Sequence, residues 1–369
     1  MAAAAVLRVF YTAMAAAFLP FLHPDPALIR SNALTENLPP PHGLHYALLG
    51  IWERFDTLWF LRIAEHGYDR PMAAIFYPLY PAAIRLVSGL MPAMAAALLV
   101  STTAAFFFFW ALLRLAADEL SEVGRLRMLL LVCAWPTSFV MFAGYADSLT
   151  LALVVWAVVF GREAGREPRR EARWEAATAC GLLAGLARPS GVLVFIPLIV
   201  MALRSWQVRS LVVALTPLGL LGYWGWLRWS GRISVVEAYR LYQGMTMVPP
   251  WRGLWEALRL IVTERDTLLA IKLAVVIAVA VFSLRIQSRI QVRIEDKAFA
   301  LAVILQMLMY TGRPLLGAAR YLMMVYPAFL VWGSYAERWN GKQFGFCVMT
   351  LGLLNLTWMW AFLSWSLVL

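Results

Sequence analysis

An acidic residue set among large aromatic side chains is the first candidate for chemistry in this sequence. Asp56 lies in the segment WERFDTLWFLRIAEHGYD, close to Trp52, Phe55 and Trp59. If the segment is helical, the aromatic residues form a stripe typical of a helix at the lipid headgroups, and Asp56 faces water. An acid among bulky apolar neighbours is equally a position for a general base. The residues alone leave both interpretations open.

A second acid, Asp147, ends the sequence Gly-Tyr-Ala-Asp, which joins two apolar runs and contains Tyr145. In so tight a turn an Asp can cap the N-terminus of the following helix. It can also receive a ligand hydroxyl or a metal ion. The two roles are compatible, and the spacing favours neither.

Arginine residues mark two further breaks in apolar sequence: Arg188 in LARPSG, and Arg313 and Arg320 in GRPLLGAARY. Arg holds phosphate through paired N–H groups and keeps its charge, so these positions are candidates for a phosphate clamp. The alternative is snorkelling toward lipid headgroups. We favour the clamp for Arg188, which precedes Pro189, and regard the two roles of Arg320 as evenly balanced.

The four histidines fall between His23 and His66. His42 and His45 are three residues apart, but the prolines before them and the lack of a third ligand argue against a metal site. His66 has the better claim to a cavity. The motifs GxxxxGK[ST], GxGxxG after a strand and HExxH are absent from the sequence, which disfavours nucleotide-driven transport and zinc proteolysis.

A membrane domain must position these residues. The chain has 369 residues, of which 62% are hydrophobic and 14% charged, with a mean hydropathy of +0.71. Soluble domains are less apolar and carry about 25% charged residues. Three cysteines, each inside an apolar run, cannot form a disulfide framework or a zinc cluster. A net charge of +11 alone could indicate a nucleic-acid partner. Because the charges lie between apolar runs, we interpret them as part of a membrane protein and expect no nucleic-acid partner.

Apolar runs long enough to cross a bilayer predict an all-α polytopic protein with about 11 transmembrane helices. The expected spans are residues 3–22, 91–116, 128–144, 147–161, 174–187, 190–203, 208–228, 267–285, 298–312, 320–336 and 345–365. Residues 75–90 are short and hold two prolines, so we expect an interfacial helix there. The whole chain, 1–369, is expected to be one membrane domain with two long outer loops, 23–90 and 229–266.

The distribution of basic residues predicts the orientation. With the N-terminus inside, five short cytoplasmic connections carry 16 Lys and Arg, whereas the short outer connections carry only Arg188, Arg313 and Arg320. This asymmetry is the one expected of membrane proteins. It places the acids and the three arginines together on the outer side.

Several segments resemble, in chain order, those of the PIG-V-like mannosyltransferases of the GT-C superfamily, glycosyltransferases that use polyprenyl-phosphate sugars. The matching segments are RFDTLWFLRIAEHGYD, IFYPLYP, AWPTSFVMFAGYADSLTLAL, GLLAGLARPSGVL and, more weakly, RYLMMVYP. Most of the resemblance lies between Trp52 and Phe195. The family's Trp-Asp, Tyr-Ser-Glu and Arg-Ser-Asn-Gly are replaced here by Phe55-Asp56, Tyr145-Ala146-Asp147 and Arg188-Pro189-Ser190-Gly191.

The resemblance implies a GT-C-like fold and an inverting transfer of a hexose, mannose in that family, from a polyprenyl or dolichyl phosphate to an acceptor hydroxyl on the outer face. Asp56 would then be the general base, which is the chief reason to prefer that role, and Asp147 would orient hydroxyl groups. Arg188, with Arg313 or Arg320, would hold the lipid phosphate. The remaining expected substrate-binding residues are Glu53, Glu65, His66, Tyr68, Tyr145 and Tyr321.

We expect no cofactor beyond the lipid-linked donor and assign no metal ligands, while a divalent metal stays open. The expected partners are the donor, a lipid-linked, glycan or protein acceptor, and membrane lipids. The expected location is a bacterial cytoplasmic membrane, or the endoplasmic reticulum if the source is eukaryotic. Two other interpretations remain: a secondary transporter or lipid flippase, and a non-catalytic subunit of a membrane glycosylation complex.

Overall fold

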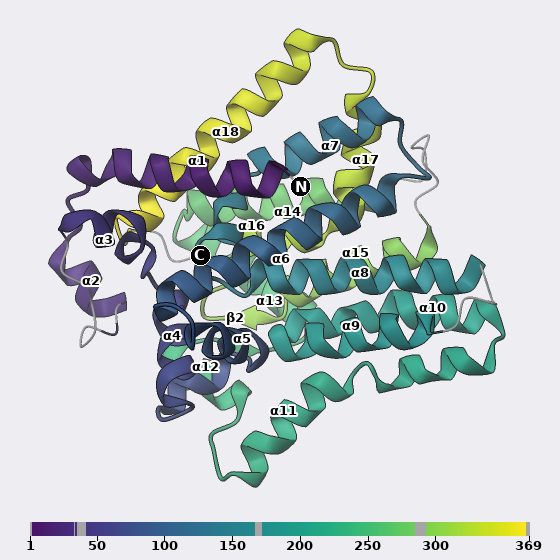
Figure 1. Ribbon diagram of the computed structural model, residues 1–369, viewed down its shortest axis with the longest axis horizontal. Coiled ribbons are helices and arrows are strands. Elements are labelled where there is room, and N and C mark those ends of the chain that lie inside the picture. Colours follow the sequence, from purple (N-terminus) through teal and green to yellow (C-terminus); the bar gives the residue numbers. More distant parts are fainter. Residues whose placement is uncertain (1, 33, 35–41, 167–171, 285–292, 367–369) are drawn as a thin grey trace.

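The computed structural model describes residues 2–32, 34, 42–166, 172–284 and 293–366 (Figure 1). Helices form nearly all of it, as the apolar composition predicts, and the described strands are one antiparallel pair. The first half contains α1 (Ala2–Phe18), η1 (Leu19–Phe21), α2 (Pro26–Asn32), α3 (Gly43–Leu48), η3 (Gly50–Trp52), α4 (Asp56–His66), η4 (Pro71–Ile75), α5 (Leu79–Ser88), α6 (Ala93–Ala116), α7 (Glu122–Ala134), η5 (Ser138–Phe142), α8 (Asp147–Arg166) and α9 (Arg173–Ala187). The second half contains η6 (Pro189–Val194), α10 (Phe195–Ser205), η7 (Val208–Leu215), α11 (Leu218–Trp229), α12 (Val235–Gln243), β1 (Thr246–Met247), α13 (Pro250–Thr263), α14 (Thr267–Leu284), α15 (Ile294–Met307), β2 (Tyr310–Thr311), α16 (Ala318–Tyr321), η8 (Leu322–Met324), α17 (Tyr326–Ala336) and α18 (Gly341–Leu363).

Six helical segments among the described residues are long and apolar enough to cross a membrane. They are Ala3–Phe21, Ala93–Ala116, Asp147–Arg166, Val208–Trp229, Thr267–Leu284 and Gly341–Leu363, and each coincides with an expected span. The chain is therefore an all-α polytopic membrane protein.

The other five expected spans are shorter or broken helices. Pro136 and Pro189 follow the ends of α7 and α9 by two residues, where a proline cannot continue the hydrogen-bonded ladder. The apolar run 128–144, for example, is the end of α7, a turn and then the 3₁₀ helix η5. The expected interfacial segment 75–90 contains α5, whose ten residues are too short to cross a bilayer.

Small residues bring the central helices together. In Figure 1, α6, α8 and α9 run alongside one another, and α8 contacts both of its neighbours. The buried face of α6 includes Ala96, Ala97, Ala104 and Ala105. Where α11 crosses α9, a Cβ on Gly219 would lie 2.0 Å from the carbonyl oxygen of Leu182. Such close approach is how transmembrane helices gain packing energy in an apolar solvent.

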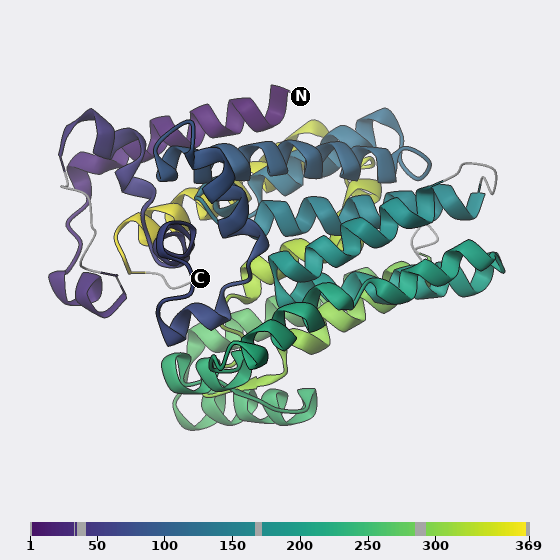
Figure 2. The ribbon, with the colours of Figure 1, turned by 60° about the horizontal axis from the view of Figure 1, so that its bottom comes forward.

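The helices of the first long loop, α2 to α5, gather at one end of the bundle together with α12 (Figures 1 and 2). The expected aromatic stripe at the headgroups is wrong. Helix α4 begins only at Asp56, so Trp52 and Phe55 precede it, and both are buried inside the protein. Arg8 of α1 stacks over the Trp52 ring at 4.7 Å. We call this end of the bundle, which also holds the site described next, the cavity end.

Candidate active site

The first turn of α4 holds Asp56 at the cavity end and docks it on the turn that carries Asp147. The Thr57 hydroxyl donates a hydrogen bond of 2.8 Å to the Ala143 carbonyl oxygen. Gly144, at φ +79°, has a conformation that favours glycine, and a Cβ there would lie 3.0 Å from the Thr57 methyl group. The segments that carry the two acids, 91 positions apart in the sequence, are thus joined by this hydrogen bond between a side chain and the backbone.

Asp147 begins α8, and the turn before it is supported by the IFYPLYP motif. Tyr80 of α5 shares a hydrogen bond of 2.6 Å with Ser101 of α6. The Ser101 hydroxyl lies 3.1 Å from the Tyr145 carbonyl oxygen, to which it donates. Helices α5 and α6 therefore hold the Tyr145–Asp147 turn in position.

Arg188 lies at the break between α9 and η6. Its backbone is extended, with φ −156° and ψ 152°, and Pro189 starts the 3₁₀ helix. Gly191 allows that helix to fold back on α9, because a Cβ there would lie 2.1 Å from the Ala184 carbonyl oxygen. The Arg-Pro-Ser-Gly sequence thus has a geometric role: it turns the Arg188 side chain away from the path of α9.

Arg320 lies in the short helix α16, which the AWPTSF break holds in place. The Trp135 indole N–H and the Thr137 hydroxyl each donate to the Ala319 carbonyl oxygen at 3.0 Å. Gly317, at φ +71°, starts the turn. The residue next to Arg320 is therefore anchored by the turn between α7 and η5, more than 180 positions earlier.

These four side chains form a continuous chain of charges. Arg320 Nη1 donates to Asp56 Oδ2 at 3.0 Å, and its Nε lies 3.5 Å from Asp147 Oδ1. Arg188 Nη1 lies 2.5 Å from Asp147 Oδ2. The Tyr321 ring lies under Arg188 at 5.0 Å, and the Tyr145 ring under Arg320 at 5.2 Å. Two arginines and two aspartates give the cluster no formal net charge.

Burial and hydrogen bonding distinguish the four groups. The exposed fractions of the side chains are 7% for Arg320, 10% for Asp147, 12% for Arg188 and 31% for Asp56. Arg320 Nε and Asp147 Oδ2 are buried within ion-pair distance of an opposite charge, yet neither makes a hydrogen bond of acceptable geometry. Buried charged groups normally satisfy their hydrogen bonds, so the cluster retains one free donor on Arg320 and one free acceptor on Asp147.

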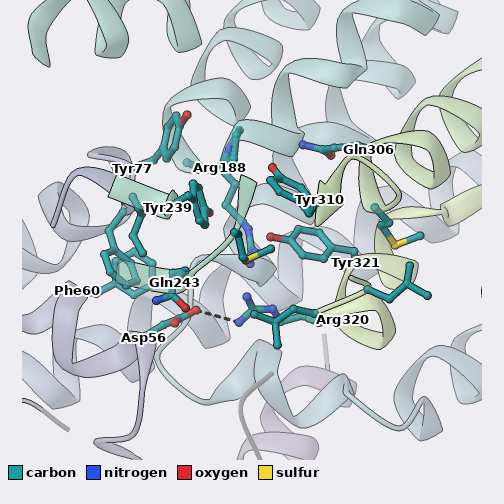
Figure 3. A pocket seen from close by; sticks show the side chains of 18 residues that line it. Asp56, Phe60, Tyr77, Arg188, Tyr239, Gln243, Gln306, Tyr310, Arg320 and Tyr321 are labelled. Carbon is teal, nitrogen blue, oxygen red and sulfur yellow. Dashed lines mark hydrogen bonds and ion pairs between the residues drawn. The ribbon is translucent and has the colours of Figure 1, made fainter. Parts of the chain in front are cut away.

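A cavity opens directly over this cluster (Figure 3). It contains about 1070 Å³ of empty space, counting its open mouth. Its lining residues are Asp56, Phe60, Ile75, Phe76, Tyr77, Ala187, Arg188, Pro189, Tyr239, Gln243, Met245, Gln306, Met307, Tyr310, Leu315, Leu316, Arg320 and Tyr321. In Figure 3, Asp56 and Gln243 lie beside Arg320 at one end, and Tyr77, Tyr310 and Gln306 lie at the other.

The structure does not bring every expected site residue to the cavity. Glu65 and His66 lie 3.8 Å apart, and about half of each side chain is exposed away from its lining. Arg313 is exposed, and Tyr68 points instead to the Phe76 carbonyl oxygen at 2.8 Å. Glu53 is half-buried beside Arg54, and burial raises its pKa to about 7. Within the described part of the chain, no cluster of three or more His, Cys, Asp or Glu residues could hold a metal ion.

Sequence reasoning missed the uncharged polar wall of the cavity, formed by Tyr77, Tyr239, Gln243, Gln306 and Tyr310. Burial raises the pKa of Tyr77, Tyr239 and Tyr310, so these phenols stay protonated at neutral pH. Tyr77 lies in the IFYPLYP segment, whereas Tyr239 on α12 and Tyr310 on β2 lie in segments without a motif. The available signals were the IFYPLYP segment for Tyr77 and the second long loop, 229–266, for Tyr239 and Gln243.

Fold and site together define a polytopic α-helical membrane protein with two arginines and two aspartates clustered at a cavity. Among solved structures, the chain is similar to ArnT from Cupriavidus metallidurans in the apo state, with a TM-score of 0.51 and 12% sequence identity. The similarity covers 85% of this chain and 71% of that ArnT chain. A structure of the same ArnT bound to undecaprenyl phosphate has a TM-score of 0.52, with the same identity and coverage.

No family model matches the chain, and no curated protein sequence matches it. The comparisons therefore show a fold similar to that of ArnT, whereas the GT-C assignment, the PIG-V-like resemblance and the mannosyl specificity that it implies remain predictions.

Proposed function

We propose that the protein is a membrane glycosyltransferase that transfers a sugar from a polyprenyl-phosphate carrier to an acceptor hydroxyl. The observation that carries this proposal is the pair of buried arginines, Arg188 and Arg320, beside the more exposed carboxylate of Asp56 on the floor of the cavity. A phosphate site next to an acid matches the two needs of the reaction: a stabilised leaving group and a proton acceptor.

The donor phosphate is assigned to Arg188 and Arg320. The structure of ArnT with undecaprenyl phosphate shows that a protein of this fold binds a polyprenyl phosphate. In the present chain, Arg320 Nε has hydrogen-bonding capacity to spare, and both guanidinium groups line the cavity. A phosphate placed between them would receive charge-assisted hydrogen bonds from groups that burial already holds in position.

The residues present account for the bonds formed and broken and for the proton transferred in this reaction. The acceptor oxygen forms a bond to the anomeric carbon while the bond from that carbon to the phosphate oxygen breaks. Asp56 takes the acceptor proton, and the polyprenyl phosphate leaves with the bonding electron pair toward the arginines. A single displacement of this kind inverts the anomeric configuration. Asp147 is assigned a positioning role, since Arg188 and Arg320 both contact it.

The ion pair between Arg320 and Asp56 implies an order of events. While Arg320 Nη1 donates to Asp56, one carboxylate oxygen of the base is engaged. Donor phosphate would compete for the same guanidinium group and so release Asp56 to accept the proton. Binding of the donor before the acceptor follows from this exchange.

The uncharged wall of the cavity supports an uncharged sugar. Tyr77, Tyr239, Tyr310 and Gln306 offer hydroxyl and amide groups that suit sugar hydroxyls. Among the described residues that line the cavity, charge is confined to Asp56, Arg188 and Arg320. A neutral hexose fits this lining, and mannose is our choice because of the PIG-V-like segments. The distribution of basic residues and the PIG-V-like resemblance also support an outward-facing cavity end. It would open outside a bacterial cytoplasmic membrane or into the endoplasmic reticulum lumen.

The decisive experiment measures transfer of radiolabelled mannose from synthetic polyprenyl-phosphate-mannose in membranes that contain the protein. Asp56→Asn should abolish transfer and leave the protein folded. Asp69→Asn is the matched control, because Asp69 lies in the same loop, outside the cavity, in an exposed ion pair with Arg62. Equal transfer by wild type and Asp56→Asn would overturn the assignment. Donor translocation without sugar transfer would favour the transporter, and activity only with a co-expressed partner would favour the subunit.

A further inference from the structure

Helix α13 has an apolar face that nothing in the described part of the chain covers. Trp251, Trp255, Leu258 and Val262 recur at spacings of four, three and four residues, so they form one stripe on the helix. Their exposed fractions are 70%, 70%, 42% and 77%. An exposed stripe of this size is unusual on a helix that faces only water.

The same helix has two other faces. Gly253 and Ala257 are buried against the protein, and a Cβ on Gly253 would lie 1.9 Å from the Leu308 carbonyl oxygen. Arg252, Arg259 and Thr263 are exposed on a third side. A helix with one face on protein, one polar and one apolar is typical of the boundary between water and lipid, where tryptophan is enriched.

The short connection to the spanning helix α14 limits how far the end of α13 can lie from the bilayer. It ends at Thr263, and the spanning helix α14 begins at Thr267. Asp266 caps α14, since its carboxylate accepts a hydrogen bond of 2.9 Å from the Leu269 amide. With three residues between the two helices, the C-terminal end of α13 cannot lie more than about 14 Å from the end of a membrane span.

We propose that α13 lies in the lipid headgroup region and docks its tryptophan face into the bilayer at the cavity end. The partner is the apolar boundary of the leaflet. Charged lipids are not required, because Arg259 is paired with Glu256, at 2.7 Å, and the helix is left with one further arginine.

This membrane contact also supports the cavity wall. Gly253 presses on the backbone at Leu308, two residues before Tyr310, which lines the cavity. The Val248 amide donates to the Met309 carbonyl oxygen at 2.8 Å, and β1 pairs with β2 through Met247 and Tyr310. Helix α13 and β2 therefore form one wall, with lipid on one side and the cavity on the other. The two elements lie together in Figure 1.

Site-directed spin labelling in nanodiscs of phosphatidylcholine tests the proposal. Cys133, Cys180 and Cys347 are first replaced by alanine, and single cysteines are then introduced as Trp255→Cys, Val262→Cys, Arg252→Cys, Thr263→Cys and Ala257→Cys. Labels at 255 and 262 should relax with oxygen but not with a water-soluble nickel complex. Labels at 252 and 263 should show the reverse, and a label at 257 should be shielded from both.

Nickel accessibility at 255 and 262 equal to that at 252 and 263 would overturn the proposal in favour of a water-facing helix. Shielding of 255 and 262 from both reagents would overturn it in favour of a protein partner, such as a second copy of the chain. A second measurement is hydrogen exchange of the amides of residues 308–311 in the Trp251→Ser/Trp255→Ser variant. Exchange should be at least tenfold faster than in wild type, and unchanged exchange would show that lipid does not hold the wall.

Discussion

Arg320 and Asp56 are 264 positions apart in the chain, yet Arg320 Nη1 donates to Asp56 Oδ2 at 3.0 Å on the floor of the cavity. The arginine side chain is 7% exposed and the aspartate 31%, so the pair has a buried cation and an acid that reaches the cavity. The same guanidinium group contacts Asp147. Among the described residues Arg320 alone forms ion pairs with both acids, and its removal would leave Asp56 without this partner and Asp147 with Arg188.

The shape of the Arg320 side chain should matter as well as its charge. Arg320→Lys keeps the charge but loses the fork of N–H groups that can contact two acids or hold a phosphate at two points. We expect sugar transfer to fall by about 10- to 100-fold, mainly through a higher KM for the lipid donor. The measurement is initial transfer rate against donor concentration. Arg313→Lys, on an exposed arginine outside the cavity, is the control, and an equal loss there would contradict the assignment of the phosphate to Arg320.

Glu53 should make stability depend on pH. Burial raises its pKa from 4.5 to about 7 in the folded protein, so between these values the folded state holds more protons than the unfolded state. Stability therefore falls as pH rises through this window, by about 1–3 kcal/mol. Glu53→Gln should raise the apparent Tm in detergent at pH 8 and leave it nearly unchanged at pH 4.5. A variant whose Tm follows wild type at both pH values would show that Glu53 is not buried as described.

The sequence predicted the parts of this molecule that depend on local chemistry. Apolar length identified the six long spans, and the prolines after α7 and α9 indicated two further breaks in the apolar sequence. Charge type singled out Asp56, Asp147, Arg188 and Arg320, which the structure places in one cluster. Their approach could not be derived, because it depends on contacts such as that from Thr137 to the Ala319 carbonyl oxygen, which no local pattern encodes.

The errors have physical causes too. An aromatic stripe was expected on the helix that carries Asp56, but Phe55, with φ 47°, ends any helical path before that residue. Trp52 then turns inward to Arg8. The polar wall was missed because Tyr239 and Tyr310 meet only through the pairing of β1 with β2, two strands of two residues each. Pairings so short leave no periodic signal in a sequence.

A buried acid far from the cavity should affect folding and not chemistry. Asp296 of α15 is 1% exposed; it pairs with Arg162 of α8 and accepts a hydrogen bond of 2.5 Å from the Tyr326 hydroxyl of α17. Asp296→Asn removes one partner of a buried pair, which costs about 3–5 kcal/mol of stability. We expect a lower apparent Tm with an unchanged KM in the remaining folded protein. A changed donor KM at unchanged Tm would instead give Asp296 a role in the reaction.

The last prediction concerns Gly191, which gives the Arg188 break its shape. A Cβ at this position would lie 2.1 Å from the Ala184 carbonyl oxygen, so Gly191→Ala must push η6 away from α9. Overpacking of this kind costs about 1–3 kcal/mol, and it moves Arg188 relative to Asp147. We expect lower thermal stability together with weaker binding of undecaprenyl phosphate, measured by calorimetry in detergent.

Gly222→Ala on α11 is the matched control, since a Cβ there would meet no atom within 4 Å. Because alanine favours helix over glycine, that variant should be as stable as wild type or slightly more so. If Gly191→Ala behaves like Gly222→Ala, the close approach of η6 to α9 does not position Arg188.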